Sequence, residues 1–367
     1  MLSFIAFIVL LYGLQILKYR IGWEKIKPKS QQIFTPEVSI VIAMRNEESE
    51  IKRLISTLKK QIYPIDFLEI ILVNDHSTDA TLALLEQAEM DNLQIINMPD
   101  GEFGKKNAIA KAVKTAKGEI ILASDADCSF MPNWVRTMVS YFADEQIKLV
   151  SGPVGFHKQK GVFQSLQALE FASLIGSGAG AIGMGNAIFC NGANMAYRKA
   201  IFLEVNNFEN DKAVSGDDVF LLHSVKAKYP KAIAFAKNEN AIVTTEGVQT
   251  LKGFINQRKR WTAKSSGYKD WASIYTSFLV LFANVIGVIL IGLLFFDANY
   301  LNYFLYYFGL KFLADLYLLF PVLNFFKRKD LVKWILPFEL FYSFYIVLIV
   351  ILSFTNTFEW KGRIHKK

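Results

Sequence analysis

Long apolar stretches lie near the two ends of this 367-residue chain, and a region with the mixed pattern of a globular protein lies between them. The first stretch covers residues 1–17, and three more follow the mixed region at 271–296, 299–322 and 334–354. A helix that rises about 1.5 Å per residue needs roughly 20 residues to cross the hydrocarbon core of a bilayer. The pattern therefore predicts one N-terminal and about three C-terminal transmembrane helices.

Lys and Arg residues gather beside these apolar stretches. Five of them follow the first stretch, namely Lys18, Arg20, Lys25, Lys27 and Lys29. Because cytoplasmic loops are enriched in Lys and Arg, we expect a multi-pass protein of the cell membrane whose mixed region faces the cytoplasm. The net charge of +8 would also suit a nucleic-acid-binding protein, but the other basic residues are scattered. An anionic membrane surface explains the charge better, so we expect no nucleic-acid partner.

We divide the chain into an anchor at 1–20, a cytoplasmic domain at 36–265, C-terminal membrane segments at 271–356 and a basic tail at 357–367. The loop at 326–333 is basic too, so the charge rule places both it and the tail in the cytoplasm. One spanning helix between them would put them on opposite sides. Either the tail lies outside against the rule, or the last segments include a re-entrant or interfacial piece.

Two charged residues interrupt the third apolar stretch. Lys311 and Asp315 are four residues apart, a spacing that lets them pair on one face of a helix. We interpret them as a neutralised pair that faces other helices, and a role in lining a substrate path is the alternative.

The middle region has the pattern of a parallel α/β sheet. Short runs rich in β-branched residues predict strands at 38–43, 69–73 and 119–123, and a helical pattern follows the first at 51–60. A polar or acidic segment follows each predicted strand. Because α/β sheets bind ligands beyond the carboxyl ends of their strands, these segments indicate a ligand site.

The same region contains six motifs in a fixed order: VSIVIAMRNEE, ILVNDHSTDAT, GKKNAIAKAVKTAKGEIILASDADC, NGANMAYRK, SGDDVFLL and QRKRW. The series, over residues 36–261, resembles that of family 2 glycosyltransferases, especially the membrane branch with cellulose synthases, hyaluronan synthases and ceramide glucosyltransferase. The resemblance implies a GT-A-type, Rossmann-like domain that binds a nucleotide sugar. The chain departs from the family pattern where Met44 and Arg45 replace an aromatic residue and Asn74 replaces an Asp, so these departures bear on the nucleotide contacts.

Asp125 and Asp127 form the DxD pair of this series. A hard cation such as Mg²⁺ or Mn²⁺ needs one or two carboxylates besides the phosphate oxygens of its ligand. By resemblance, Asp127 is the direct metal ligand and Asp125 lies at the edge between the ribose and the metal. A solvated turn after a strand is the alternative.

Three further residues are assigned to the donor. By resemblance, Asp75 accepts the imide N–H of uracil, although an Asx-turn or a helix cap would also explain it. Lys105, which follows Gly104, offers a positive charge to the diphosphate, with a solvated basic turn as the alternative, and Glu47 of the first motif completes the set. The spacing of GEFGKK does not fit a Walker A loop.

Asp217 and Asp218 precede an apolar run, where two carboxylates would also suit the start of a helix. The family places its catalytic base in this acidic pair. We assign the base to Asp218, with Asp217 as support or acceptor contact.

Gln257, Arg260 and Trp261 share one helical face because they lie at positions i, i+3 and i+4. By resemblance to the QxxRW motif they are catalytic, and Trp261 also offers a ring face to the acceptor sugar. An interfacial helix is the alternative, and we assign its role on lipid headgroups to Arg258 and Lys259.

Asn191 and Asn194, on either side of Gly192, resemble the acceptor-side loop of the family, and buried amides that bond the backbone are the alternative. A separate GxGxxG match at Gly178, Gly180 and Gly183 follows an amphipathic stretch instead of a strand. Small residues for close packing, or a flexible segment at the membrane interface, explain it better than a dinucleotide site.

We therefore expect an inverting membrane glycosyltransferase that moves a sugar, from UDP by resemblance, to a lipid or glycan, with Mg²⁺ or Mn²⁺. A processive polysaccharide synthase is one alternative. An inactive, transferase-like scaffold or transport protein is another.

Overall fold

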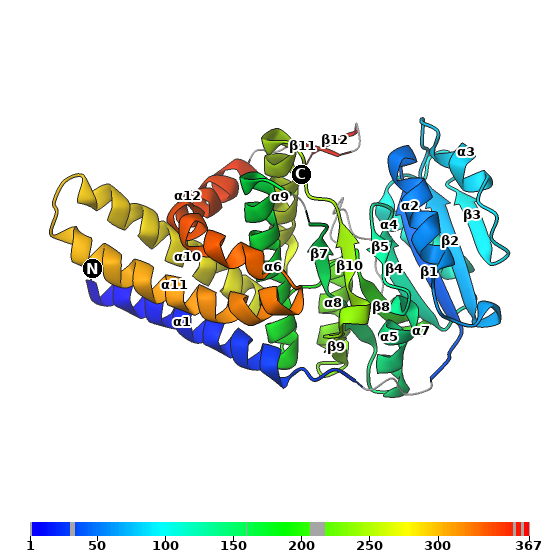
Figure 1. Ribbon diagram of the computed structural model, residues 1–367, viewed down its shortest axis with the longest axis horizontal. Helices are drawn as coiled ribbons and strands as arrows, with labels where there is room; N and C mark the ends of the chain where they lie inside the picture. Colours follow the sequence, from blue (N-terminus) through cyan, green and yellow to red (C-terminus); the bar gives the residue numbers. More distant parts are fainter. Residues whose placement is uncertain are drawn as a thin grey trace.

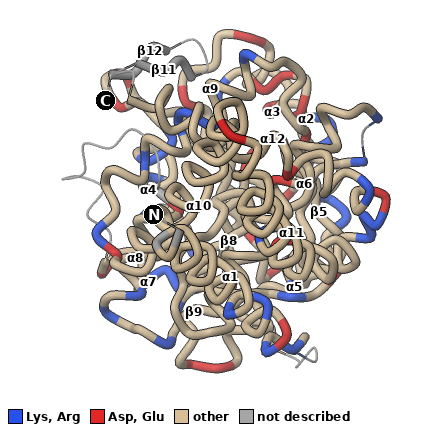
Figure 2. The backbone as a smooth tube through the Cα atoms, turned by 90° about the vertical axis from the view of Figure 1, so that its left-hand side faces the viewer, with Lys and Arg blue, Asp and Glu red and all other residues tan. Residues whose placement is uncertain are grey.

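The structure is a computed structural model that describes residues 2–29, 34–158, 160–205, 217–354, 357–360 and 363–366. A bundle of long helices forms one end of the molecule and an α/β domain forms the other (Figure 1). The long helices are α1 (Leu2–Lys25), α10 (Trp271–Leu294), α11 (Tyr300–Phe325) and α12 (Ile335–Ser353). All four helices, α12 with the preceding turn, are long and apolar enough to cross a membrane, as the apolar pattern predicts. Viewed from the bundle end, α1, α10 and α11 are mostly free of charged positions (Figure 2).

A seven-stranded mixed sheet forms the centre of the α/β domain, in the order β3-β2-β1-β4-β8-β6-β9. Its strands are β1 (Val38–Met44), β2 (Leu68–Asn74), β3 (Leu93–Asn97), β4 (Ile120–Asp125), β6 (Leu149–Ser151), β8 (Met195–Arg198) and β9 (Ile233–Phe235). The strands predicted from sequence are β1, β2 and β4, which pair in parallel. Their register sets Met44 opposite Asn74 and Ala43 opposite Asp125, so the polar segments begin at one edge.

Helices and a small sheet complete the domain. The helices are α2 (Glu48–Lys59), α3 (Thr81–Glu86), α4 (Lys105–Thr115), α5 (Trp134–Val139), α6 (Val162–Gly183), α7 (Lys199–Val205), α8 (Asp217–Lys228) and α9 (Leu251–Lys264). The small sheet has the order β5-β10-β7, from Ser129–Phe130, Val243–Thr245 and Val154–Phe156. Short 3₁₀ turns lie at Ile65–Phe67, Ser140–Ala143, Glu239–Ala241, Ser265–Gly267 and Lys329–Trp334.

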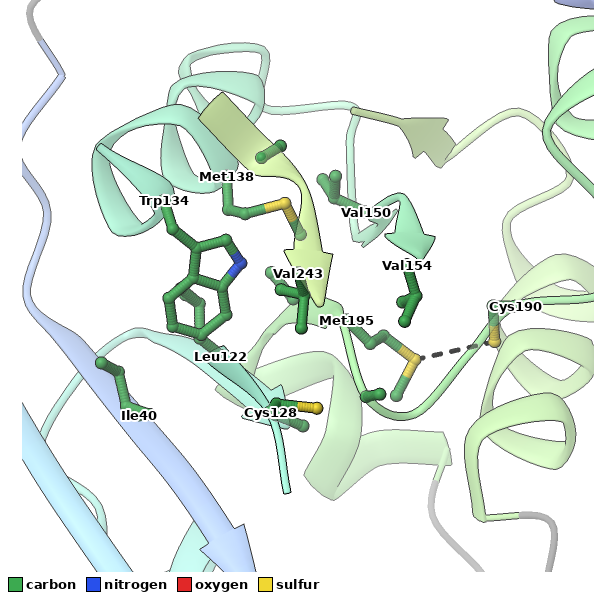
Figure 3. Packing of buried hydrophobic residues seen from close by; sticks show 14 of the residues in the cluster. Ile40, Leu122, Cys128, Trp134, Met138, Val150, Val154, Cys190, Met195 and Val243 are labelled. Atoms are coloured by element: carbon green, nitrogen blue, oxygen red, sulfur yellow. Dashed lines mark hydrogen bonds between the residues drawn. The ribbon is translucent and has the colours of Figure 1, made fainter. Parts of the chain in front are cut away.

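The core lies between the central sheet, α5 and the small sheet. Ile40 and Leu122 of the central sheet, Trp134 of α5 and Val243 of β10 are fully buried there (Figure 3). β1 and β4 are mostly apolar, as expected of strands covered on both faces. This packed core supports the carboxyl edge of the sheet, where the polar segments begin.

α1 and α6 cross with their backbones in direct contact, and glycines make the crossing possible. A Cβ atom on Gly180 would lie 2.2 Å from the carbonyl oxygen of Tyr19, and one on Gly22 would lie 1.9 Å from that of Gly180. Gly183 meets Gly22 in the same way. The GxGxxG match therefore lies within a helix, and its use in close packing is confirmed.

Lys311 pairs with Asp315 at 2.8 Å, as predicted, and it also pairs with Glu339 of α12. Tyr12 of α1 donates a hydrogen bond of 2.6 Å to Asp315. The pair therefore joins three membrane helices.

Both ends of α12 lie on the side of the α/β domain (Figure 1). In the loop between α11 and α12, Lys327 pairs with Glu239 of the domain at 2.5 Å. After α12, the hairpin of β11 (Thr357–Trp360) and β12 (Arg363–Lys366) follows, and β11 lies beside α9. α1, α10 and α11 instead extend away from the domain (Figure 1).

Candidate active site

A cavity of about 1230 Å³ begins at the carboxyl edge of the central sheet and continues between the membrane helices. Asp75, Asp125 and Asp218 line its polar end, whereas Ile16, Leu318 and Ile349 line its apolar end. One space therefore joins the predicted donor site to the predicted membrane region.

The DxD pair lies at the polar end, directly after β4. Asp127 accepts a hydrogen bond of 3.0 Å from the hydroxyl of Thr245 on β10, and Asp125 pairs with Lys105 at 2.5 Å. Within the described parts of the chain, no three His, Cys, Asp or Glu side chains gather as a metal cage. Two carboxylates at the rim of a cavity suit a cation that completes its shell with phosphate oxygens and water. The residues present therefore fit Mg²⁺ or Mn²⁺ bound together with a diphosphate.

Asp75 is 2% exposed and its carboxylate faces the cavity at the end of β2. It accepts a hydrogen bond of 3.0 Å from the backbone of Gly104, which precedes α4. Arg45 donates to the carbonyl oxygens of Asp75 and His76 at 3.0 and 2.9 Å. Arg45, one of the residues that depart from the family pattern, therefore stabilises the loop that carries Asp75. Glu47 also lines the cavity.

Asn74, the other departure from the family pattern, serves the fold. Its side-chain N–H donates to the side-chain oxygen of Asn97 at 2.8 Å. Its side-chain oxygen accepts a hydrogen bond from the backbone N–H of Ser77 at 3.1 Å. It is 5% exposed. Asn74 therefore ties the ends of β2 and β3 together.

Asp218 lies in the first turn of α8, where the helix dipole favours a carboxylate. The backbone of Gly192 donates to it at 3.0 Å, and the ammonium group of Lys264 lies 3.6 Å away. Burial raises the pKa of Asp218, but Lys264, Lys105 and two backbone N–H groups outweigh burial and hold that pKa below its ordinary value. Asp218 is therefore ionised at neutral pH. The side chain of Asp217 lies outside the described part of the structure.

α9 carries the QxxRW motif along the cavity, and Gln257, Arg260 and Trp261 all line it. The role expected of Arg258 is wrong. Arg258 is 3% exposed and forms a buried ion pair with Glu170 of α6, so it does not reach lipid headgroups. Its planar fork prefers a carboxylate, and burial removes it from the membrane surface.

The two asparagines of the acceptor loop have different surroundings. Asn191 lines the cavity, and the backbone of its neighbour Gly192 donates a hydrogen bond to Asp218. Asn194 is fully buried and bonds Trp134, the carbonyl oxygen of Pro153 and that of Ala241 at 2.8–2.9 Å. The acceptor role expected of Asn194 is therefore wrong, because its side chain is fully buried outside the cavity lining and both of its amide N–H groups already donate to backbone carbonyls. The alternative given for Asn194, a buried amide that forms hydrogen bonds with the backbone, agrees with the structure.

The sequence profile described as "Glycosyl transferase family 2" matches residues 39–205, which contain β1, β2, β4 and the DxD pair. The chain therefore carries a family 2 glycosyltransferase domain. The "Beta-monoglucosyldiacylglycerol synthase" of Synechocystis is 32% identical over 111 residues, which are 29% of this chain and 23% of that protein. The "Probable glycosyltransferase YdaM" of Bacillus subtilis is 25% identical over 331 residues, which are 83% of this chain and 72% of that protein.

A solved structure agrees with the GT-A-type fold predicted from the motifs. The "Mannosyltransferase PcManGT from Pyrobaculum calidifontis in complex with GDP-Man and Mn2+" superposes with a TM-score of 0.60, covering 97% of this chain and 99% of that one. The two sequences are 16% identical. The chain spans only about a quarter of the length of the cyanobacterial relative.

Two residues of the glycosyltransferase domain escaped the sequence analysis. Lys264 follows the QxxRW motif and faces Asp218. Lys264 lies three residues after Trp261, so the sequence already places it on the same face of the helix as the motif. Glu170 is a lone acid within an apolar helix, and such a residue signals a buried partner on another element.

Proposed function

We propose that the protein is a membrane-bound inverting glycosyltransferase that moves a sugar from a nucleoside diphosphate to a lipid acceptor. The observation that carries this proposal is the continuity of the cavity from Asp125 and Asp218 to the apolar walls between α1, α10, α11 and α12. A donor at the polar end and a lipid that enters from the membrane would meet beside Asp218.

Asp218 acts as the general base. It is ionised at neutral pH and lines the cavity, so it can accept the proton of an acceptor hydroxyl. The hydroxyl oxygen then attacks the anomeric carbon while the bond from that carbon to the diphosphate oxygen breaks. Attack from the face opposite the leaving group inverts the anomeric configuration. Asn191, beside the base, is placed to bind another acceptor hydroxyl.

Positive side chains bind the leaving diphosphate. Lys105 at the start of α4 and Arg260 on α9 both line the polar end of the cavity. Their charges stabilise the negative charge that develops on the diphosphate as the glycosidic bond breaks. Mg²⁺ or Mn²⁺, held by Asp127 and Asp125, would supply further neutralisation of that charge. Asp75 and Glu47 bind the nucleoside part, with uracil as the base that suits an accepting carboxylate at Asp75.

The apolar end of the cavity favours a lipid over a glycan chain. Leu279, Leu318, Ile346 and Ile349 come from α10, α11 and α12 and offer no hydrogen bonds to sugar hydroxyls. The two acids that these helices add to the lining, Asp315 and Glu339, are already paired with Lys311. An acyl or isoprenoid chain fits such walls because burial of its methylene groups is favourable. The cyanobacterial relative is by name a synthase of a glucosylated lipid, monoglucosyldiacylglycerol, which supports this acceptor class.

The catalytic domain, which we place at residues 36–265, faces the cytoplasm. α1, α10 and α11 cross the membrane, and α12 lies at the membrane surface without crossing it. The positions of Lys327 and β11 beside the α/β domain support this arrangement of α12. The basic tail and the basic loop before α12 are then both cytoplasmic, in agreement with the charge rule.

Labelling tests this topology. In intact cells, an impermeant thiol reagent should label Asp297→Cys, in the turn between α10 and α11, because that turn faces outward. It should not label Lys114→Cys of the α/β domain or a cysteine added after Lys367. Both native cysteines are buried. Labelling of the added terminal cysteine would show that α12 crosses the membrane.

Transfer is tested with membranes from cells that contain the protein. They are incubated with Mn²⁺ and radiolabelled UDP-glucose, UDP-galactose, UDP-N-acetylglucosamine or GDP-mannose, and lipids are extracted into an organic solvent. We expect label in the organic phase for the parent and none for Asp218→Asn. Label in a water-soluble polymer would instead identify a processive synthase. A folded parent that binds UDP but transfers nothing would identify an inactive scaffold.

A further inference from the structure

Arg258 is buried where α6, α9 and α12 meet, and it lies in the wall of the cavity that Trp261 also lines. Its Nε donates to both carboxylate oxygens of Glu170 at 3.0 and 2.9 Å, and its Nη2 donates to one of them at 2.5 Å. Its remaining nitrogen, Nη1, donates to the side-chain oxygen of Gln257. Every nitrogen of the guanidinium group therefore has a partner on α6 or α9.

The flat faces of the same guanidinium group contact two aromatic rings. Its central carbon lies 4.3 Å from the ring centre of Trp261 and 4.4 Å from that of Phe254. A guanidinium group stacks on aromatic rings through both its charge and its planar shape. Two of the three QxxRW side chains, Gln257 and Trp261, are thus held by one buried cation.

A third element fixes this cation from the membrane side. Tyr345 of α12 donates a hydrogen bond of 2.5 Å to the Glu170 oxygen that also accepts from Arg258. The ring of Tyr345 stacks on Phe254 with centres 5.7 Å apart. Tyr345 itself lines the cavity, beside the apolar Ile346. α12 therefore contacts both the acceptor path and the group that holds Trp261.

A buried ion pair of this kind is poor evidence of stability, because desolvation of both charges opposes their attraction. Such pairs are retained in some proteins because they fix one geometry. Here the geometry that they fix is that of the motif side chains at the cavity wall.

We infer that Arg258, Glu170 and Tyr345 form a positioning set that aims Trp261 and Gln257 at the acceptor and connects their placement to α12. The inference deepens the proposed function, since it rests on Trp261 as an acceptor contact. None of the three residues exchanges protons with the substrate. They act through Trp261 and Gln257.

The geometry itself is tested without any substrate, by ¹⁹F NMR of protein labelled with 5-fluorotryptophan. The chain has six Trp residues, and Trp261→Phe identifies the resonance of Trp261 by its loss. Arg258→Lys keeps the charge but loses the planar fork, Glu170→Gln keeps the shape but loses the charge, and Tyr345→Phe removes one hydroxyl. Each should shift or broaden the Trp261 resonance. Lys259→Gln, a change on the same helix outside this set, should leave it in place.

Kinetics then separate positioning from a purely structural role. Arg258→Lys should lower kcat by about 10- to 100-fold, as expected for a misplaced acceptor contact, and leave the KM of the donor within about threefold. A merely structural defect would instead reduce kcat in proportion to the fraction that still binds UDP. In a Trp261→Phe background, Arg258→Lys should lower kcat by a clearly smaller factor than it does in the parent, because only Gln257 is then left for Arg258 to position.

Tyr345→Phe still tests the inference if Arg258→Lys and Glu170→Gln do not fold, because it leaves the ion pair between Arg258 and Glu170 intact. An unmoved Trp261 resonance in folded Tyr345→Phe, or fully additive effects of Arg258→Lys and Trp261→Phe, would overturn the inference. Failure of the parent to transfer sugar would refute the proposed function alone, because the NMR comparison needs no acceptor.

Discussion

The ammonium group of Lys105 lies 2.5 Å from a carboxylate oxygen of Asp125, so the lysine of α4 contacts the first acid of the DxD pair. The same lysine contributes to the low pKa of Asp218 on α8. One cation therefore lies between the donor side and the acceptor side of the cavity. Its loss should affect both.

Lys105→Met should weaken the binding of UDP by at least about tenfold, because a hydrogen bond to a charged group contributes about 1.5–3 kcal/mol. Isothermal titration with UDP and Mn²⁺ measures the change. Lys111→Met, an exposed lysine on the same helix, is the matched control and should bind UDP as the parent does. Equal affinities for the two variants would remove Lys105 from the donor site.

Asp127→Asn tests the metal assignment. The substitution keeps the shape of the side chain but removes the charged oxygen ligand that Mg²⁺ or Mn²⁺ prefers. We expect transfer to be abolished and the affinity for UDP to become independent of Mn²⁺. A folded variant that still binds UDP more tightly with Mn²⁺ than without it would contradict the assignment.

The sequence predicts the parts of the site that follow from strand order and leaves out those that depend on packing between distant elements. β1, β2 and β4 are apolar runs with polar ends, so their shared edge and the positions of Asp75 and Asp125 are foreseeable. The environments of Arg258 and Asn194 are not. Arg258 reads as exposed because its neighbours on α9 are basic, and only the placement of α6 brings Glu170 to it.

The path of α12 shows the same limit. Its 19 apolar-rich residues satisfy the length and composition of a spanning helix, so sequence alone cannot distinguish it from α10. What distinguishes them is the placement of their ends. That placement depends on the ion pair between Lys327 and Glu239 and on the contact of β11 with α9. Both contacts join residues that are far apart in the chain.

The pH dependence of transfer should report on Lys264. In the parent, the pKa of Asp218 is below its ordinary value, so the acidic limb of the kcat/KM profile should lie below about pH 4. Lys264→Met removes the positive charge that lowers the pKa of Asp218 most. The pKa of Asp218 should rise, and the acidic limb should move to higher pH. A limb that stays in place would show that Asp218 is not the group that titrates in it.

Gly192→Ala should displace the base by a few tenths of an ångström. An added Cβ would lie 3.3 Å from the Cβ of Asp218, 3.5 Å from its Oδ2 and 3.6 Å from the ammonium group of Lys105. We expect kcat to fall by about tenfold with little loss of UDP affinity, since small misplacements are costly in catalysis. Gly309→Ala, where no atom lies within 4 Å of the added group, is the control. Full activity of Gly192→Ala would show that the base tolerates this shift.

Asp218→Asn separates binding from chemistry. The variant keeps the size of the side chain and can still accept the hydrogen bond from Gly192, but it cannot take a proton at neutral pH. Because Asp218 acts on the acceptor, the affinity for UDP should stay within a few-fold of the parent. The rate of transfer should nevertheless fall by roughly 10² to 10⁴, the contribution typical of a positioned general base.

The neighbouring acid provides the comparison for that variant. Asp217→Asn should have a milder effect, because the proton is assigned to Asp218, and single-turnover measurements of sugar transfer distinguish the two. If Asp217→Asn is inactive and Asp218→Asn remains active, the base is Asp217 and the bonds from Gly192 and Lys264 serve only to hold α8 in place. If both variants remain active, neither carboxylate of this pair takes the proton, and the mechanism proposed here is wrong.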